Sequence, residues 1–146
     1  MIVTTDQSFL SMWLCRRIGL VATPDLRCIG NVLNGHLKGV VGYDSYNGAS
    51  IVMHSAGDDP WLTKDMLWAV FDFPFNVCKV NVVLGFVPSG NKQAIKFNTH
   101  IGFKTQCILE GAHPDGALVV MTMARGECRF LNRRSHGQKV EAAATT

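Results

Sequence analysis

Two Asn-Gly dipeptides, Asn34-Gly35 and Asn47-Gly48, constrain the fold of this chain more than any other feature. Asn-Gly between β-prone runs is the strongest short-range indication of an antiparallel hairpin, because both residues tolerate a positive φ. The flanking runs are rich in Val, Ile, Leu and Tyr. We therefore predict three consecutive antiparallel strands, over residues 27–33, 37–46 and 49–55.

A later run, residues 80–87 (VNVVLGFV), is apolar almost throughout, which is typical of a strand covered on both faces. Between it and the third strand, residues 61–73 have apolar side chains at helical spacing, and Pro60 suits a first helical position. Pro74 interrupts that helical pattern. A helical crossover joins parallel neighbours, so the sequence predicts a parallel pair in the centre of the sheet.

Two further helices and two strands complete the predicted order. Residues 6–18 carry an apolar stripe, expected to face the core, and Arg16 and Arg17 lie in the last turn before Gly19. A helix over 91–100, ended by Gly102, precedes strands over 103–109 and 117–123. This order predicts an α/β (α+β) fold, with a mixed, mostly antiparallel sheet and helices on both faces.

Composition predicts one domain over residues 1–131 and a disordered basic tail over 132–146. The chain has 146 residues, 47% of them hydrophobic, with no apolar run near the length of a membrane span. Five scattered cysteines without a C-x-x-C pair indicate reduced, mostly buried thiols, among them Cys78 and Cys107.

We expect a cytoplasmic protein with no assigned metal ligands. The formal net charge of +3 only weakly indicates an anionic partner, through Arg125, Arg129, Arg133, Arg134 and Lys139.

The segment 91–103 (NKQAIKFNTHIGF) resembles the N-x-x-A-x-x-[LF]-x-x-x-x-G-F signature of the GNAT acyltransferases, and the strand order around it is also that of the family. Residues 61–64, 70–75 and 127–130 further resemble small phage-encoded GNATs and, more distantly, the branch that acetylates ribosomal-protein N-termini. The resemblance covers about residues 26–131. In a phage-encoded protein, the cytoplasm would be that of the host.

The resemblance implies that acetyl-CoA, or another acyl-CoA, binds where two parallel strands separate and leave backbone groups for the pantetheine arm. The pyrophosphate would meet the N-terminus of the helix after Pro60. Asn91 would contact the pantetheine arm, although an N-cap is its ordinary role, and Thr63 is equally explained as a helix-start residue. The implied cofactor contacts are Val52, Met53, Ser55, Trp61, Thr63, Asn91 and Phe97.

Two departures from the family pattern affect the chemistry. Asp58 and Asp59 stand where many members carry a glycine-rich phosphate loop, so they would repel the pyrophosphate unless they point away. Asn98 stands where many members have a tyrosine that protonates the departing thiolate; it either donates a hydrogen bond or has no role.

His54 is the candidate general base, because histidine titrates near neutral pH; its alternative is a structural role. A water relay to His100, Asp58 or Asp59 stays open, and Glu110 and His113 either line the acceptor groove or are simple turn residues.

Three functions remain open at this point. The first is an N-acetyltransferase that transfers an acetyl group to an amine, on a protein or small molecule, by direct attack in a ternary complex. The second is an inactive GNAT-fold protein that binds a host protein, because fold alone does not imply activity. The third, and weakest, is a nucleic-acid binder that uses the basic tail. A homodimer is compatible with each of them.

Overall fold

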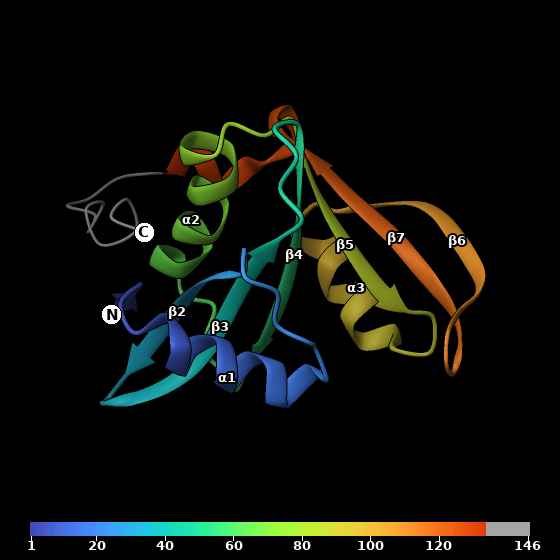
Figure 1. Cartoon of the computed structure of the whole chain (residues 1–146). Coiled ribbons are helices and arrows are strands. Elements are labelled where there is room, and N and C mark those ends of the chain that lie inside the picture. Colours follow the sequence, from blue (N-terminus) through green and yellow to red (C-terminus); the bar gives the residue numbers. More distant parts are fainter. Residues whose placement is uncertain (134–146) are drawn as a thin grey trace.

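Seven strands form one mixed sheet in the order β1-β2-β3-β4-β5-β7-β6, in a computed structural model that describes residues 1–133 (Figure 1). Only β4 and β5 are parallel; the other neighbours are antiparallel. This confirms the predicted mixed sheet with a central parallel pair. The strands are β1 (Ile2–Val3), β2 (Arg27–Leu33), β3 (His36–Asp44), β4 (Ser50–Gly57), β5 (Val82–Pro88), β6 (Lys104–His113) and β7 (Gly116–Ala124). The two-residue β1 was not predicted.

The two Asn-Gly dipeptides form different turns. Asn34 (φ 53°) and Gly35 (φ 79°) both have positive φ and connect β2 to β3 directly, as predicted. The second connection is longer and spans residues 45–49, because β3 ends at Asp44. In this loop the side chain of Asn47 accepts hydrogen bonds from the backbone N–H groups of Ala49 and Ser50, at 2.9 and 2.8 Å.

The helices lie on both faces of the sheet, as predicted (Figure 1). Helix α1 (Gln7–Ile18) packs on β2, β3 and β4 on one face, through a small apolar cluster. Helices α2 (Lys64–Asp72) and α3 (Lys92–Ile101) pack against the larger core on the opposite face. We call these the α1 face and the α2/α3 face.

The apolar stripe of α1 is only partly buried, so the expectation that it faces the core holds for some of its side chains and is wrong for others. Asp6 caps the helix, Gly19 ends it in a left-handed conformation (φ 68°), and Leu10 and Leu14 are buried. Phe9, Met12 and Ile18 remain 44, 45 and 40% exposed. A single helix on this face has no neighbouring helix in the described residues to cover its outer side.

Helix α2 begins three residues later than predicted, and a π-helical turn continues it past the predicted stop. Thr63 is its N-cap, so Pro60 precedes the helix instead of opening it. Pro74 lies inside a π-helical turn, Phe73–Val77, in which the N–H of Cys78 donates to the carbonyl of Phe73. The wider turn accommodates a proline that would clash in a regular α-helix.

The described chain ends in two 3₁₀ turns, Arg125–Glu127 and Arg129–Arg133. Arg125 donates to the Phe75 carbonyl and Arg129 to the His100 carbonyl, so these two arginines stabilise the fold. The predicted tail lies outside the described residues except for its first two, and so do Arg134 and Lys139. No helix among residues 1–133 is long and apolar enough to cross a membrane.

Candidate functional site

Strands β4 and β5 separate after three paired positions, Ser50↔Val82, Ile51↔Val83 and Val52↔Leu84. Strand β4 nevertheless continues to Gly57 and β5 to Pro88 (Figure 1). Their outer edges pair with β3 and β7, so the opening lies between two otherwise satisfied strands. No strand of the described chain fills this β4/β5 gap, and its borders therefore present backbone groups that can bond to a ligand.

The backbone groups that face the gap follow from strand alternation. The carbonyl of Ala49 accepts from the N–H of Asn81 at 2.8 Å and therefore points toward β5. Successive residues direct their N–H and C=O groups to alternate edges. Met53 and Ser55, in phase with Ala49, consequently face the gap, whereas the polar backbone groups of Val52 face β3.

The same reasoning applies to β5, whose Val82 N–H approaches the Ala49 carbonyl at 3.3 Å. Phe86 is in phase with Val82 and faces the gap with its backbone. Between these positions lies Gly85, where an added Cβ would meet no atom of the described residues within 4 Å. That open space lies on the α2/α3 face beside the gap, because a Cβ projects from the face of the sheet and Gly85 is in phase with Val83 and Val87 of the larger core.

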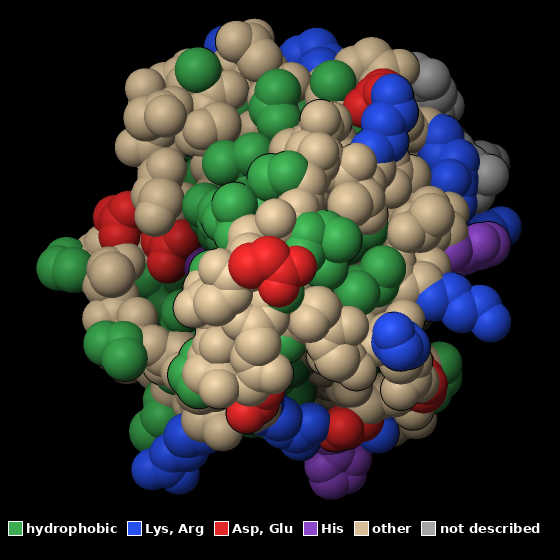
Figure 2. Space-filling model, turned by 90° about the vertical axis from the view of Figure 1, so that its right-hand side faces the viewer, with side chains coloured by type: hydrophobic (Ala, Val, Ile, Leu, Met, Phe, Trp, Pro, Cys, Tyr) green, Lys and Arg blue, Asp and Glu red, His purple; other side chains and the backbone are tan. Residues whose placement is uncertain are grey.

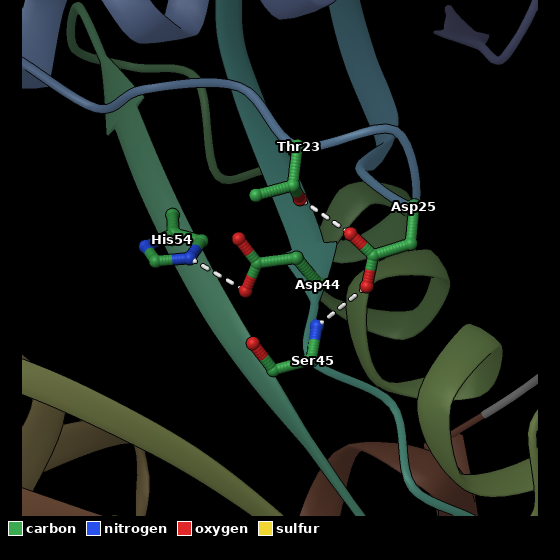
Figure 3. Close-up of polar contacts among 5 residues, drawn as sticks. All are labelled: Thr23, Asp25, Asp44, Ser45 and His54. Atoms are coloured by element: carbon green, nitrogen blue, oxygen red, sulfur yellow. Dashed lines mark hydrogen bonds and ion pairs between the residues drawn. The ribbon is translucent and has the colours of Figure 1, made fainter.

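His54 lies on β4 beside the gap, with its side chain on the α1 face (Figure 3). Its Nε2 is 3.0 Å from Oδ1 of Asp44, the last residue of β3. The two side chains are 20% and 10% exposed. Asp44 was not among the predicted site residues. Only its position at the end of an otherwise apolar strand distinguishes it in the sequence.

Beyond the gap, the α1 face of the sheet is apolar and uncovered. Phe86 and Leu109 are each 44% exposed there, and α1 does not extend over these strands. Figure 2 shows hydrophobic side chains gathered in the middle of the view, with acidic side chains among and beside them. We define the apolar band by the residues that strand alternation places on this face, namely Leu84, Phe86, Cys107, Leu109, Leu118 and Val120. Cys107 is exposed, which corrects the expectation that it is buried.

Asn91 is the N-cap of α3, and its Oδ1 accepts from the Ala94 N–H at 3.2 Å. It also lines a pocket of about 420 Å³ at the end of β5, together with His113, the last residue of β6, and Asp115 of the β6–β7 turn. The structural role of Asn91 is thus confirmed, and its contact with a cofactor remains a prediction. Glu110 lies on the exposed part of β6.

The two remaining predicted residues of α3 differ in their surroundings. The side-chain amide of Asn98 lies 3.9 Å from the sulfur of Met121, so it rests against β7 on the α2/α3 face. Phe97 is 40% exposed. Neither residue reaches His54, which is on the opposite face of the sheet. Any contact between them is therefore through a ligand that lies in the gap.

The loop before α2 is held by packing of Trp61, which the sequence did not indicate, and by a cap at Thr63, which it did. The Trp61 ring is 8% exposed and packs on Gly39 and Gly57, where an added Cβ would be 2.1 and 2.4 Å from ring atoms. The Thr63 hydroxyl caps α2 by accepting from the Met66 N–H, at 3.2 Å. Both side chains therefore serve packing and capping, and their predicted cofactor contacts remain untested.

Asp58 is turned toward α1 and away from the start of α2. Arg17 donates to both of its carboxylate oxygens, at 2.7 and 3.1 Å, and these hydrogen bonds lower the pKa of Asp58. The paired charge answers the predicted conflict with a pyrophosphate, since one of the two carboxylates is neutralised by a guanidinium. Asp59 forms no ion pair of this kind with the described residues.

A mixed sheet that opens at its central parallel pair, with the crossover helix α2 before that opening and α3 after it, defines the fold of the GNAT acetyltransferase superfamily. Solved structures of one enzyme of Vibrio cholerae share this fold. Its spermidine/spermine N-acetyltransferase, in a structure of mutant forms, matches with a TM-score of 0.72 and 12% identity over 91% of this chain and 96% of that one. A single-residue variant of the enzyme matches with a TM-score of 0.71 and 12% identity over 91% of this chain and 96% of that one. A chimera of the enzyme matches with a TM-score of 0.73 and 11% identity over 90% of this chain and 98% of that one.

These identities establish the fold alone. Neither the protein-family models nor the curated proteins gave a match to this sequence. The resemblance to phage-encoded members and to the ribosomal-protein branch accordingly stays a prediction from the residues that carry it.

Proposed function

We propose that this protein is an acyl-CoA-dependent N-acyltransferase that transfers an acetyl group from acetyl-CoA to an amine. The observation that carries the proposal is the β4/β5 gap with a histidine at its border: the parallel pair ends at Val52 and Leu84, and His54 follows two residues later on the same face as Val52. A gap with exposed backbone suits an amide-rich chain such as pantetheine, and a histidine suits proton transfer.

The residues around the gap fit acetyl-CoA in three places. The backbone of Met53, Ser55 and Phe86 would pair with the pantetheine arm as an added strand does. The N-terminus of α2, with Thr63 and Lys64, would meet the pyrophosphate. Asn91 would contact the arm from the start of α3. The thioester supplies an activated carbonyl carbon.

The reaction requires a neutral amine, a donor for the carbonyl oxygen and a proton acceptor. The backbone N–H of Ser55 donates to the carbonyl oxygen as it gains charge, because the ladder pair Val52↔Leu84 already uses the N–H of Met53. His54 accepts the proton that the amine loses as the C–N bond forms and the C–S bond breaks. Asn98 has no proton to give, so the thiolate leaves as an anion or takes a proton from water. The acceptor and acetyl-CoA are bound together, with no covalent enzyme intermediate.

The first test is calorimetric titration of the protein with acetyl-CoA and with free CoA. We expect saturable one-to-one binding that weakens about 10-fold in Asn91→Ala, as the loss of one good hydrogen bond does. Asn91→Ser is the matched control, because serine also caps a helix but lacks the amide. Equal weakening in both variants supports a direct contact, and normal binding by Asn91→Ser assigns the residue to capping alone.

The alternative function is that of an inactive GNAT-fold protein that binds a host protein or nucleic acid. The absence of binding at millimolar acetyl-CoA would reject the enzyme and leave the fold unchanged. Binding of nucleic acid that weakens steeply with salt would then favour the basic residues as the functional surface. Binding of acetyl-CoA justifies a search for the acceptor among small amines and protein N-termini.

A further inference from the structure

We propose that Asp44 is a positioning residue that holds His54 in one tautomer, with the proton on Nε2, so that Nδ1 is the atom that accepts the proton of the amine. The catalytic meaning of this inference rests on the proposed function, whereas the tautomer itself does not. It is carried by the geometry at the end of β3 and by the surroundings of the two side chains.

The register of β3 and β4 brings the pair together. Asp44 is paired with Val52, so His54 is its diagonal neighbour on the same face, at a spacing that long side chains can bridge. Directly opposite His54 is Gly42, which has no side chain to contact the ring. The imidazole therefore leans toward Asp44, and Nε2 lies 3.0 Å from its Oδ1 (Figure 3).

The chemistry of the pair decides the tautomer. An ionised carboxylate only accepts hydrogen bonds, so the ring nitrogen that contacts it must carry the proton. In a neutral imidazole, the other nitrogen then has the free lone pair. That nitrogen, Nδ1, points away from Asp44 (Figure 3). Since the two side chains are only 20% and 10% exposed, water competes weakly for this hydrogen bond.

The backbone turn that follows Asp44 is held by its surroundings. The next residue, Ser45, has a left-handed backbone (φ 57°), which is uncommon for a residue with a side chain. Its N–H donates to Asp25 Oδ2 at 2.9 Å, and the hydroxyl of Thr23 donates to the other oxygen of Asp25 (Figure 3). The loop before β2 thus fixes the turn that orients Asp44.

A nearby thiol does not compete with the imidazole as a base. Burial, and secondly the negative charge of Asp44, raise the pKa of Cys15, which keeps this thiol protonated at neutral pH. The pair of Asp44 and His54 therefore has the two parts that a positioned general base requires, an acceptor for one ring nitrogen and a free lone pair at the other.

The test measures the tautomer directly by long-range ¹H–¹⁵N correlation on the uniformly labelled full chain, with the His54 signals identified by their loss in His54→Gln. We expect a protonated Nε2 and an unprotonated Nδ1 in the neutral ring. In Asp44→Asn, whose amide can also donate, the tautomer should shift toward Nδ1–H. The value of kcat should fall about 100-fold or more, with the KM for acetyl-CoA nearly unchanged.

Asp6→Asn is the matched control, because it removes a carboxylate at the α1 N-cap while asparagine still caps. It should leave the His54 tautomer and kcat as they are. An Nδ1–H tautomer in the unmodified protein would overturn the inference, and so would an unchanged kcat in a folded Asp44→Asn. If Asp44→Asn does not fold, the tautomer of His54 in the unmodified protein alone supports or overturns the inference. If the protein has the expected tautomer but no acyltransferase activity, the proposed function is rejected, whereas the role of Asp44 in positioning His54 is not.

Discussion

At the scale of single residues, the same side chain behaves differently according to whether a helix covers its part of the sheet. Cys28 and Cys107 are both strand residues in apolar sequence surroundings. Cys28 is buried beneath α1, and this burial, with a smaller contribution from Cys15, raises its pKa to about 12. Cys107 lies in the uncovered apolar band and is exposed. Reactivity toward thiol reagents requires both access and thiolate.

We therefore predict that one thiol, Cys107, reacts first with a disulfide reagent at pH 8. Cys28 is almost entirely protonated three or more pH units below its pKa, so it should react only when the protein unfolds. The measurement is the colorimetric release of thionitrobenzoate from the native and the urea-unfolded protein. Cys107→Ser is the control and should remove the fast phase. A fast phase that persists in this variant would contradict the assignment.

At the scale of elements, glycines allow Trp61 to pack flat on the sheet and thereby join the loop before α2 to β3 and β4. The ring covers Gly39 of β3 and Gly57 of β4. The backbone carbonyl of Trp61 accepts a hydrogen bond from the side-chain amide of Asn31, at 2.6 Å. The start of α2 is therefore positioned by a buried contact and not by helix propensity alone. In the proposed function this contact places the helix N-terminus that meets the pyrophosphate.

Gly39→Ala should destabilise the protein by about 1–3 kcal/mol, because the added methyl group would overlap the Trp61 ring in a packed interior. Gly85→Ala, within β5, is the matched control, since its methyl group meets no described atom within 4 Å. The measurement is the free energy of unfolding from urea denaturation. An equal loss of stability in both variants would point to strand flexibility, and not to the overlap, as the cause.

At the scale of the whole molecule, the helices cover the two faces of the sheet unequally. Helices α2 and α3 lie on one face, whereas the single α1 covers only β2, β3 and β4 on the other. The apolar band on β5, β7 and β6 is left open in the described chain, on the same face as His54 (Figure 2). In the proposed function, an acceptor that reaches His54 from this face must lie against the band.

Phe86→Ser should accordingly raise the KM for the acceptor amine about 10-fold, as expected for the loss of one apolar contact. The dissociation constant of acetyl-CoA should change little, because the backbone of Phe86, and not its ring, borders the gap. Val21→Ser, at a side chain that is 82% exposed and outside the band, is the control. Steady-state kinetics against both substrates separates the two effects. A change confined to acetyl-CoA would place the ring on the cofactor side.

Much of the element order was predictable because its causes are local. The turn at Asn34-Gly35 depends on two residues that accept positive φ, and the ends of α1 depend on Asp6 and Gly19. The apolar run of β5 identified the parallel strand, and the helix before it identified the crossover. The motif that opens at Asn91 indicated the GNAT fold, which the structural comparisons confirmed.

The contacts that define the candidate site depended on register and packing, which no local pattern reports. His54 and Asp44 are ten residues apart and meet only because β3 and β4 pair in one particular register. Arg17 and Asp58 are separated by 41 residues and meet only because α1 crosses the end of β4. The sequence by itself therefore determined the elements and their order. The tertiary structure decided which side chains face each other, because long-range packing sets the strand register and the covered faces.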